Sequence, residues 1–388
     1  MSNKLLLPLP DRRLELYSLS EPRRWEKPKE PMRSRIAYAA AHVVADPVAS
    51  VHPTEETAID WEATLAFRHH LWSYGLGVAE AMDTSQRGMG LDWTAAKKLI
   101  SRSITEAKAV GGLIACGAGT DNLPVAEGLT LEDIERAYEE ECEFVERLGG
   151  RVILMASRAL ARVAKGPEDY LRVYGRVLTG LAHPAILHWL GEMFDPQLSG
   201  YWGSTDITKA MNTCLSLIEQ HQDKIDGIKI SLLDKEKEVE MRRRLPLKVR
   251  MYTGDDFHYD ELIRGDEHGH SDALLGIFDA IAPAASVALQ ALDRGDTGRF
   301  SEILGPTVPL SRLLFERPTY YYKTGIVFLA YLNGHQSHFR MVSGAESARS
   351  IIHLAELFRL TDRAGLLENP ELAVNRMGHI LALAGITE

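Results

Sequence analysis

The sequence predicts an α/β fold, a (β/α)8 (TIM) barrel with a C-terminal helical region, on three observations. Eight short apolar runs occur between residues 34 and 278, and a charged or amphipathic segment follows each one. The runs contain few polar residues, which is typical of parallel strands buried on both faces. Eight such units over about 245 residues match the usual size of a barrel of this kind. A doubly wound open sheet is the structural alternative, but no glycine-rich phosphate fingerprint follows the first run.

Residues 1–33 precede the barrel and are predicted to form an extended, proline-rich arm. Five prolines alternate there with charges of both signs, and proline at this density prevents a continuous helix. Mixed charges favour a solvated arm that packs on the surface over a binding site for an anionic partner.

The barrel follows over residues 34–278. The expected strands lie at residues 35–44, 75–82, 112–118, 151–156, 184–189, 227–231, 248–253 and 272–278. Between them, apolar side chains recur every three or four residues, and several segments end in glycine, as helices commonly do.

Residues 279–388 are predicted to form a helical region beside the barrel. Four or five segments with helical periodicity occur there, and no strand signal returns.

Composition excludes several classes of function. The chain has 388 residues, of which 45% are hydrophobic and 25% charged, and 44 Lys+Arg against 54 Asp+Glu give a net charge of −10. This balance argues against a nucleic-acid-binding surface, which needs concentrated positive charge. Cys116, Cys142 and Cys214 lie far apart, which indicates a reducing compartment. The apolar run near residue 5 is broken by Pro8 and Pro10 and is too short to span a membrane. We therefore expect a cytoplasmic protein that binds neither nucleic acid nor membranes.

Lys229 is the strongest candidate for a catalytic residue. It lies in the apolar strand G-I-K-I-S at residues 227–231. Burial of an ammonium group is costly and lowers its pKa. An amine that is neutral near pH 7 can attack a carbonyl carbon and form a Schiff base. A lysine paired with an acidic residue of a neighbouring strand explains the pattern equally well.

The other candidates follow from the place of the active site in such barrels, at the C-terminal ends of the strands. The chemistry-bearing residues at or near those ends are Thr84 and Ser85 after the second strand, Arg158 after the fourth, His188 in the fifth and Asp256 after the seventh.

Several segments, in order along the chain, resemble the dihydrodipicolinate synthase and N-acetylneuraminate lyase superfamily. The strand G-I-K-I-S is similar to the Schiff-base strand of these enzymes, which commonly reads G-I-K-D-S. The segments A-I-D-W (58–61), T-G-D-D (253–256) and A-I-A-P (280–283), and Lys323 in the C-terminal region, resemble further family motifs. The resemblance covers roughly residues 34–335 of this divergent chain. It implies a barrel with a helical C-terminal domain and homo-oligomers, dimers or tetramers, built from tight dimers.

The chain departs from the family pattern at the substrate-binding motifs. M-D-T-S-Q-R-G (82–88) stands where the family reads G-T-T-G-E, so Thr84 and Ser85 keep the hydroxyl groups that hold a substrate carboxylate. His188 occupies the position of a proton-relaying tyrosine, and imidazole can take over general acid–base work. Arg158 replaces part of another motif and can supply a guanidinium group for a carboxylate or phosphate, or form a surface salt bridge.

We therefore expect a Schiff-base-forming lyase or aldolase that acts on a small keto acid or keto sugar and needs no cofactor. Lys229 would attack the substrate ketone, and His188 would move a proton. The residues expected to bind the substrate are Thr84, Ser85, Arg158 and Asp256.

Two alternatives remain open at this stage. One is a metal-dependent barrel isomerase or class II aldolase that uses Asp255, Asp256, His258 and His270. The other is a barrel without catalytic activity. We assign no metal site to His268 and His270, because a third, distant ligand is missing from the pattern. His69 and His70, on the first long helix, are expected to be packed or solvated.

Overall fold

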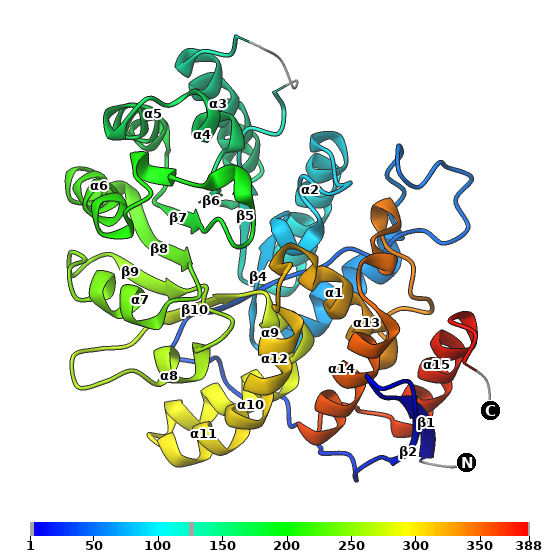
Figure 1. Ribbon diagram of the computed structural model, residues 1–388. Helices are drawn as coiled ribbons and strands as arrows, with labels where there is room; N and C mark the ends of the chain where they lie inside the picture. Colours follow the sequence, from blue (N-terminus) through cyan, green and yellow to red (C-terminus); the bar gives the residue numbers. More distant parts are fainter. Residues whose placement is uncertain (1–3, 124–127, 387–388) are drawn as a thin grey trace. The chain divides into compact units, whose positions relative to one another are not determined.

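The computed structural model describes residues 4–123 and 128–386. The chain forms two compact units (Figure 1). The barrel unit consists of Arg35–Ala41 and Gly77–Gly276, and the helical unit consists of Met1–Ser34, His42–Leu76 and Ile277–Glu388. No helix in the described ranges is long and apolar enough to cross a membrane.

The barrel unit contains a closed sheet of eight parallel strands, which confirms the predicted (β/α)8 fold. Each strand pairs with the next along the chain, and the last pairs with the first. The strands are β3 (Ala37–Ala40), β4 (Gly77–Glu80), β5 (Ile114–Ala118), β6 (Arg151–Leu154), β7 (Ala185–Leu190), β8 (Ile225–Ser231), β9 (Arg250–Thr253) and β10 (Asp272–Leu275). Each of the eight apolar runs overlaps one of these strands. Apolar side chains from the strands, including Tyr38, Ile153, Ile186, Tyr252 and Leu274, form a buried cluster.

Helices lie along the outside of the strands, as Figure 1 shows for α3, α5, α6 and α7. The helices of this unit are α2 (Trp93–Val110), α3 (Leu131–Arg147), α4 (Arg158–Val163), α5 (Pro167–Gly180), α6 (Ile207–Gln220), α7 (Lys235–Arg242) and α8 (Tyr259–Arg264). Side chains with oxygen acceptors start several of them: Asp92 accepts a hydrogen bond from the N–H of Ala95, and Thr130 and Asp133 form a capping box.

The helical unit begins with an antiparallel hairpin of β1 (Lys4–Pro8) and β2 (Leu14–Ser18). Its helices are α1 (Trp61–Ser73), α9 (Ile277–Ala280), α10 (Ala282–Asp293), α11 (Thr297–Leu304), α12 (Val308–Leu314), α13 (Tyr322–Leu332), α14 (Ile351–Arg363) and α15 (Pro370–Leu383). All residues of α13 are buried, so this helix is central to the unit. Figure 1 shows the hairpin beside α14 and α15, and β1 contacts both helices. The helical C-terminal region predicted from residue 279 onward is therefore present.

The structure differs from the sequence analysis in two respects. The first 33 residues, predicted as an extended arm, include a paired hairpin within the described residues. Residues 42–76, which contain α1, belong to the helical unit, whereas the segment boundaries drawn from the sequence placed them with the barrel at 34–278. The boundaries followed the strands, and α1 lies in sequence between the first two.

Candidate active site

Lys229 lies inside the barrel. It is opposite His188 of β7 and Tyr252 of β9 in the strand register, and Tyr252 belongs to the apolar cluster of the barrel. Paired positions of neighbouring strands point to the same face of a sheet, so Lys229 points inward. Only 7% of the residue is exposed. Gly254 leaves room for it, because a Cβ atom at residue 254 would lie 2.7 Å from Cε of Lys229.

The amine of Lys229 is buried in the barrel unit. Among the residues that the structure describes, none forms a hydrogen bond or an ion pair with its Nζ atom. Burial lowers the pKa of Lys229, while the carboxylates of Asp256 and Asp83 oppose this shift. The ion-paired lysine that the sequence left open is therefore not what the structure shows. The environment favours the neutral amine more than water does.

His188 is next to Lys229 and almost completely buried. Its Nε2 lies 3.3 Å from Oγ of Ser231, and its Nδ1 has no hydrogen-bond partner among the described residues. Burial, followed by the positive charge of Lys229, lowers the pKa of the imidazole well below its ordinary value. His188 is therefore neutral near pH 7.

Thr84 and Ser85 lie in a short 3-10 turn, η1 (Asp83–Ser85), directly after β4. Both are buried. The hydroxyl of Ser85 donates to the carbonyl of Met82 at 2.7 Å, so its proton is used within the turn. Gln86 ends the turn in the left-handed region, with φ of +67°.

Arg87, which the sequence analysis did not select, is the buried cation of this turn. Its guanidinium group donates to Asp121 at 2.7 Å, to Glu141 at 2.9 Å, and to the carbonyls of Ala81 and Gly117. Burial opposes the charge, but the two carboxylates outweigh it and raise the pKa of Arg87 above its ordinary value. Arg87 stays charged and holds together the ends of β4 and β5.

Arg158 is the first residue of α4 and forms an ion pair with Asp195. Ser157 caps the start of α4, because the hydroxyl of Ser157 accepts from the N–H of Leu160. The N–H of Ser157 donates to the hydroxyl of Tyr201, which holds the start of the helix in place. Gly88 packs against the guanidinium group, and a Cβ there would lie 2.3 Å from Nη1 of Arg158.

A small polar cavity joins several of these residues. The volume of the cavity that the centre of a water molecule can reach is ≈ 20 Å³, so the cavity has room for one or two waters. The residues lining the cavity are Asp83, Arg87, Asp121, Met155, Ala156, Arg158, His188, Leu190, Asp195 and Leu198. His188 and Arg158 therefore meet in one cavity, whereas Lys229, Thr84, Ser85 and Asp256 are not among the lining residues.

Asp255 and Asp256 follow β9, and both are buried. Asp255 braces the turn, because its carboxylate accepts from the N–H groups of Phe257 and His258 and lies 2.9 Å from Nδ1 of His258. Asp256 acts on the amine of Lys229 through its charge.

The residues of the metal-dependent alternative are not gathered in one cluster. Within the described ranges, no group of three ligand-type side chains includes Asp255, Asp256, His258, His268 or His270. His268 lies beside Glu267 on an exposed turn, at 3.3 Å. Lys323, which resembles a family motif, donates to the carbonyl of Tyr320 within the helical unit.

The comparisons with known proteins agree with this fold. Residues 5–386 match a family model described as "Protein of unknown function (DUF993)". The chain belongs to this family. No curated protein matches it.

Solved structures of dihydrodipicolinate synthases are similar to this chain in fold. The enzyme from Aquifex aeolicus is 15% identical with a TM-score of 0.64, and the match covers 86% of this chain and 100% of that one. The enzyme from Thermotoga maritima is 13% identical with a TM-score of 0.63, again covering 86% and 100%. The enzyme from Cyanidioschyzon merolae, solved with lysine bound, is 16% identical with a TM-score of 0.63 and covers 86% and 99%. The resemblance noted in the sequence is thereby confirmed for the fold.

Proposed function

We propose that the protein is a Schiff-base-forming lyase or aldolase in which Lys229 is the nucleophile. The observation that carries the proposal is a lysine inside the barrel with a lowered pKa and no ion pair among the described residues. A structural lysine would need a partner for its charge, whereas a nucleophilic amine must lose it. The shared fold of the dihydrodipicolinate synthases supports an enzyme of this class.

The chemistry follows from the amine. Nζ of Lys229 adds to the carbonyl carbon of a substrate ketone to form a carbinolamine, which takes up one proton from solvent and loses water to leave a protonated iminium. The iminium accepts the electron pair of an adjacent bond when a C–C bond breaks or water leaves, and hydrolysis returns the amine. His188, neutral and next to Lys229, accepts the proton of a substrate hydroxyl and later gives it back.

The lining of the cavity favours a polar substrate. Arg87 and Arg158 provide positive charge, and Asp83, Asp121 and Asp195 provide hydrogen-bond acceptors for hydroxyl groups. A keto acid has a carboxylate that the two arginines can bind, and a keto sugar has hydroxyl groups that the carboxylates can accept hydrogen bonds from. Because the cavity holds only one or two waters and Lys229 does not line it, the cavity must widen toward Lys229 to admit such a substrate.

The remaining residues have supporting roles in this proposal. Thr84 binds the polar end of the substrate, and Ser85 can accept a hydrogen bond there because its proton is used by Met82. Asp256 orients a substrate hydroxyl or holds the loop beside Lys229. The cytoplasmic location and the homo-oligomeric assembly stay predictions.

Borohydride trapping tests the proposal. The purified protein is incubated with a panel of keto acids and keto sugars, reduced, digested and mapped by mass spectrometry. We expect a reduced adduct on the peptide that contains Lys229, its loss in Lys229→Ala, and its retention in the control Lys248→Ala. Lys248 is exposed on the same unit and pairs with Asp223.

Two results would contradict the proposal. One is a panel in which some compounds bind the folded protein but none modifies Lys229. The other is an adduct of equal yield in Lys229→Ala whose circular dichroism matches the wild type.

A further inference from the structure

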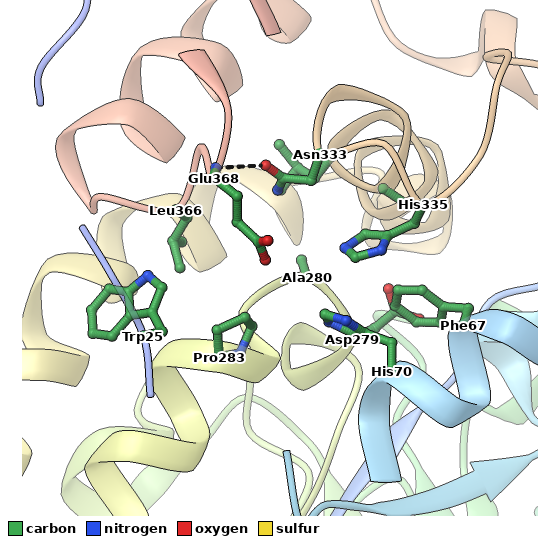
Figure 2. A pocket seen from close by; sticks show the side chains of 12 residues that line it. Trp25, Phe67, His70, Asp279, Ala280, Pro283, Asn333, His335, Leu366 and Glu368 are labelled. Atoms are coloured by element: carbon green, nitrogen blue, oxygen red, sulfur yellow. Dashed lines mark hydrogen bonds between the residues drawn. The ribbon is translucent and has the colours of Figure 1, made fainter. Parts of the chain in front are cut away.

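Three side chains of the helical unit meet outside the residues of the proposed active site. His70 lies in the last turn of α1, His335 follows α13, and Glu368 lies between α14 and α15. One ring nitrogen of each histidine and one carboxylate oxygen lie within 4.8 Å of one another. Figure 2 shows both imidazole rings and the carboxylate directed toward the same space.

Aromatic rings hold the two imidazoles in place. Phe67, one turn before His70 on α1, stacks on its ring at a centroid distance of 5.5 Å and meets the His335 ring edge-on at 5.1 Å. Tyr74 meets the His70 ring edge-on, at a centroid distance of 5.1 Å. The two imidazoles are 4.2 Å apart between centroids. Their positions are therefore defined by packing.

The backbone around the other two residues is anchored to the end of α13. The side-chain oxygen of Asn333 accepts from the N–H of Glu368 at 3.1 Å (Figure 2). The N–H of His335 donates to the carbonyl of Ala330 at 3.0 Å. Gly334, between them, has φ of +88°, a conformation that glycine adopts without strain. The segment Asn333–Gly334–His335 thus fixes both the second histidine and the acidic residue.

The polar atoms of the cluster have no partners of their own within residues 4–123 and 128–386. In the described part of the chain, neither imidazole nor the Glu368 carboxylate forms a hydrogen bond or an ion pair. In the cavity between these side chains, the volume that the centre of a water molecule can reach is ≈ 10 Å³. The cavity therefore has room for one water or one ion but not for an organic ligand.

Charges of both signs lie around the cluster. Burial and the neighbouring His335 lower the pKa of His70 to about 3, and burial lowers the pKa of His335 to about 4. Asp279 also lines the cavity, and its carboxylate lies 2.8 Å from Nδ1 of His42. Lys27 adds a positive charge nearby, and the negative charge of Glu368 offsets it.

We propose that His70, His335 and Glu368 bind one zinc ion that joins α1, α13 and the α14–α15 loop. Two imidazoles and one carboxylate, with a fourth position open to water, form a ligand set typical of Zn²⁺. Imidazole ligands favour zinc over magnesium and calcium, which prefer oxygen. Zinc bonds of about 2.0–2.1 Å require ligand atoms about 3.4 Å apart. In the structure these atoms lie within 4.8 Å of one another, so zinc binding requires them to approach by up to about 1.4 Å.

Zinc binding by the full-length, untagged protein tests this site directly. The protein is treated with a chelator and dialysed, then titrated with ZnCl2 by calorimetry, and its Tm is measured with and without the metal. We expect one zinc per chain, a rise in Tm, and no such rise with the same concentration of MgCl2. Binding to Co²⁺ should give the visible absorption bands of a tetrahedral ion.

Single substitutions locate the ion. We expect His70→Ala and His335→Ala to weaken zinc binding at least 100-fold and Glu368→Gln at least 10-fold. The control variants His379→Ala and Glu371→Gln, on α15, should bind like the wild type. Glu368 is exposed, so Glu368→Gln keeps the test valid if a histidine variant does not fold. Absence of saturable zinc binding, an equal response to magnesium, or unchanged binding in the cluster variants would overturn the proposal.

Discussion

Glu238 of α7 is a carboxyl group buried inside the barrel unit, only 1% exposed. Its Oε1 accepts from Oγ of Ser271 at 2.7 Å, and its Oε2 accepts from Oγ1 of Thr253 at 2.9 Å. Burial raises its pKa to about 8, in spite of these hydrogen bonds. The group is therefore protonated in the folded protein near pH 7.

This pKa predicts how stability depends on pH. An unfolded glutamate has a pKa of about 4.3, so between about pH 4.3 and pH 8 the unfolded chain loses the proton while the folded chain keeps it. The contribution of Glu238 is then fully present below pH 4.3 and is lost as pH rises, by at most about 1.4 kcal/mol per pH unit.

Glu238→Gln removes this pH-dependent loss of stability. We expect the variant to gain stability over the wild type between pH 6 and pH 9 in urea unfolding. Glu240→Gln, half-buried on the same helix, should show no such gain. Parallel pH profiles for Glu238→Gln and wild type would refute the prediction.

Individual residues differ in how far the sequence reveals them. Lys229 could be found because a charged residue inside an apolar strand is conspicuous. Arg87 could not, because its partner Glu141 lies 54 positions away on α3 and no local pattern links them. The same reason applies to His70, predicted to be packed or solvated, since His335 and Glu368 are distant in sequence and only the fold brings them together.

At the scale of elements, Arg87 connects the turn after β4 to the loop after β5 and to α3. Its partner Glu141 is completely buried and also accepts from the N–H of Gly119 at 2.7 Å. Arg87→Met would leave this carboxylate buried without its cation. Breaking a buried pair in this way costs about 3–5 kcal/mol.

We therefore expect Arg87→Met to lower the free energy of unfolding by about 3–5 kcal/mol in chemical denaturation. Adding Glu141→Gln should restore part of the loss, because the second change removes the unpaired charge. The control Arg136→Met, whose side chain is 72% exposed, should cost less than about 1 kcal/mol. A cost for Arg87→Met no larger than for this control would show that the network is not a stabilising link.

The elements themselves were predictable to different degrees. All eight barrel strands follow from apolar runs, because a strand buried on both faces leaves a continuous signal in the sequence. The pattern of apolar residues did not reveal the β1–β2 hairpin. Its strands are short, Leu14 and Leu16 of β2 are exposed, and the prolines at residues 8 and 10 suggested an unpaired arm. The turn that carries Thr84 and Ser85 is three residues long and has no periodicity to detect.

At the scale of the whole molecule, the two ends of the chain meet in one unit. Tyr17 of β2 donates its hydroxyl proton to Oδ2 of Asp362 on α14 at 2.8 Å. The N–H and the hydroxyl of Ser20 donate to the same carboxylate at 3.1 Å. Asp362 is only 4% exposed, so the first 20 residues provide hydrogen bonds that water cannot fully replace. No sequence pattern indicates this junction, because the partners lie more than 340 positions apart.

The junction predicts that the N-terminal segment stabilises the helical unit. Tyr17→Phe combined with Ser20→Ala removes two of the donors and leaves the buried carboxylate of Asp362 less satisfied. We expect a loss of about 1–3 kcal/mol in the free energy of unfolding, measured by thermal and chemical denaturation. Asp11→Ala, in the exposed loop of the same hairpin, serves as the control and should leave the unfolding temperature unchanged, because its carboxylate pairs only with the exposed Arg13 among the described residues. If the double variant unfolds at the same temperature as the wild type, the hairpin does not stabilise α14. If it unfolds earlier, deletion of residues 1–20 should lower the unfolding temperature further, because it also removes the carbonyl groups of Leu7 and Pro8 that accept from Arg359.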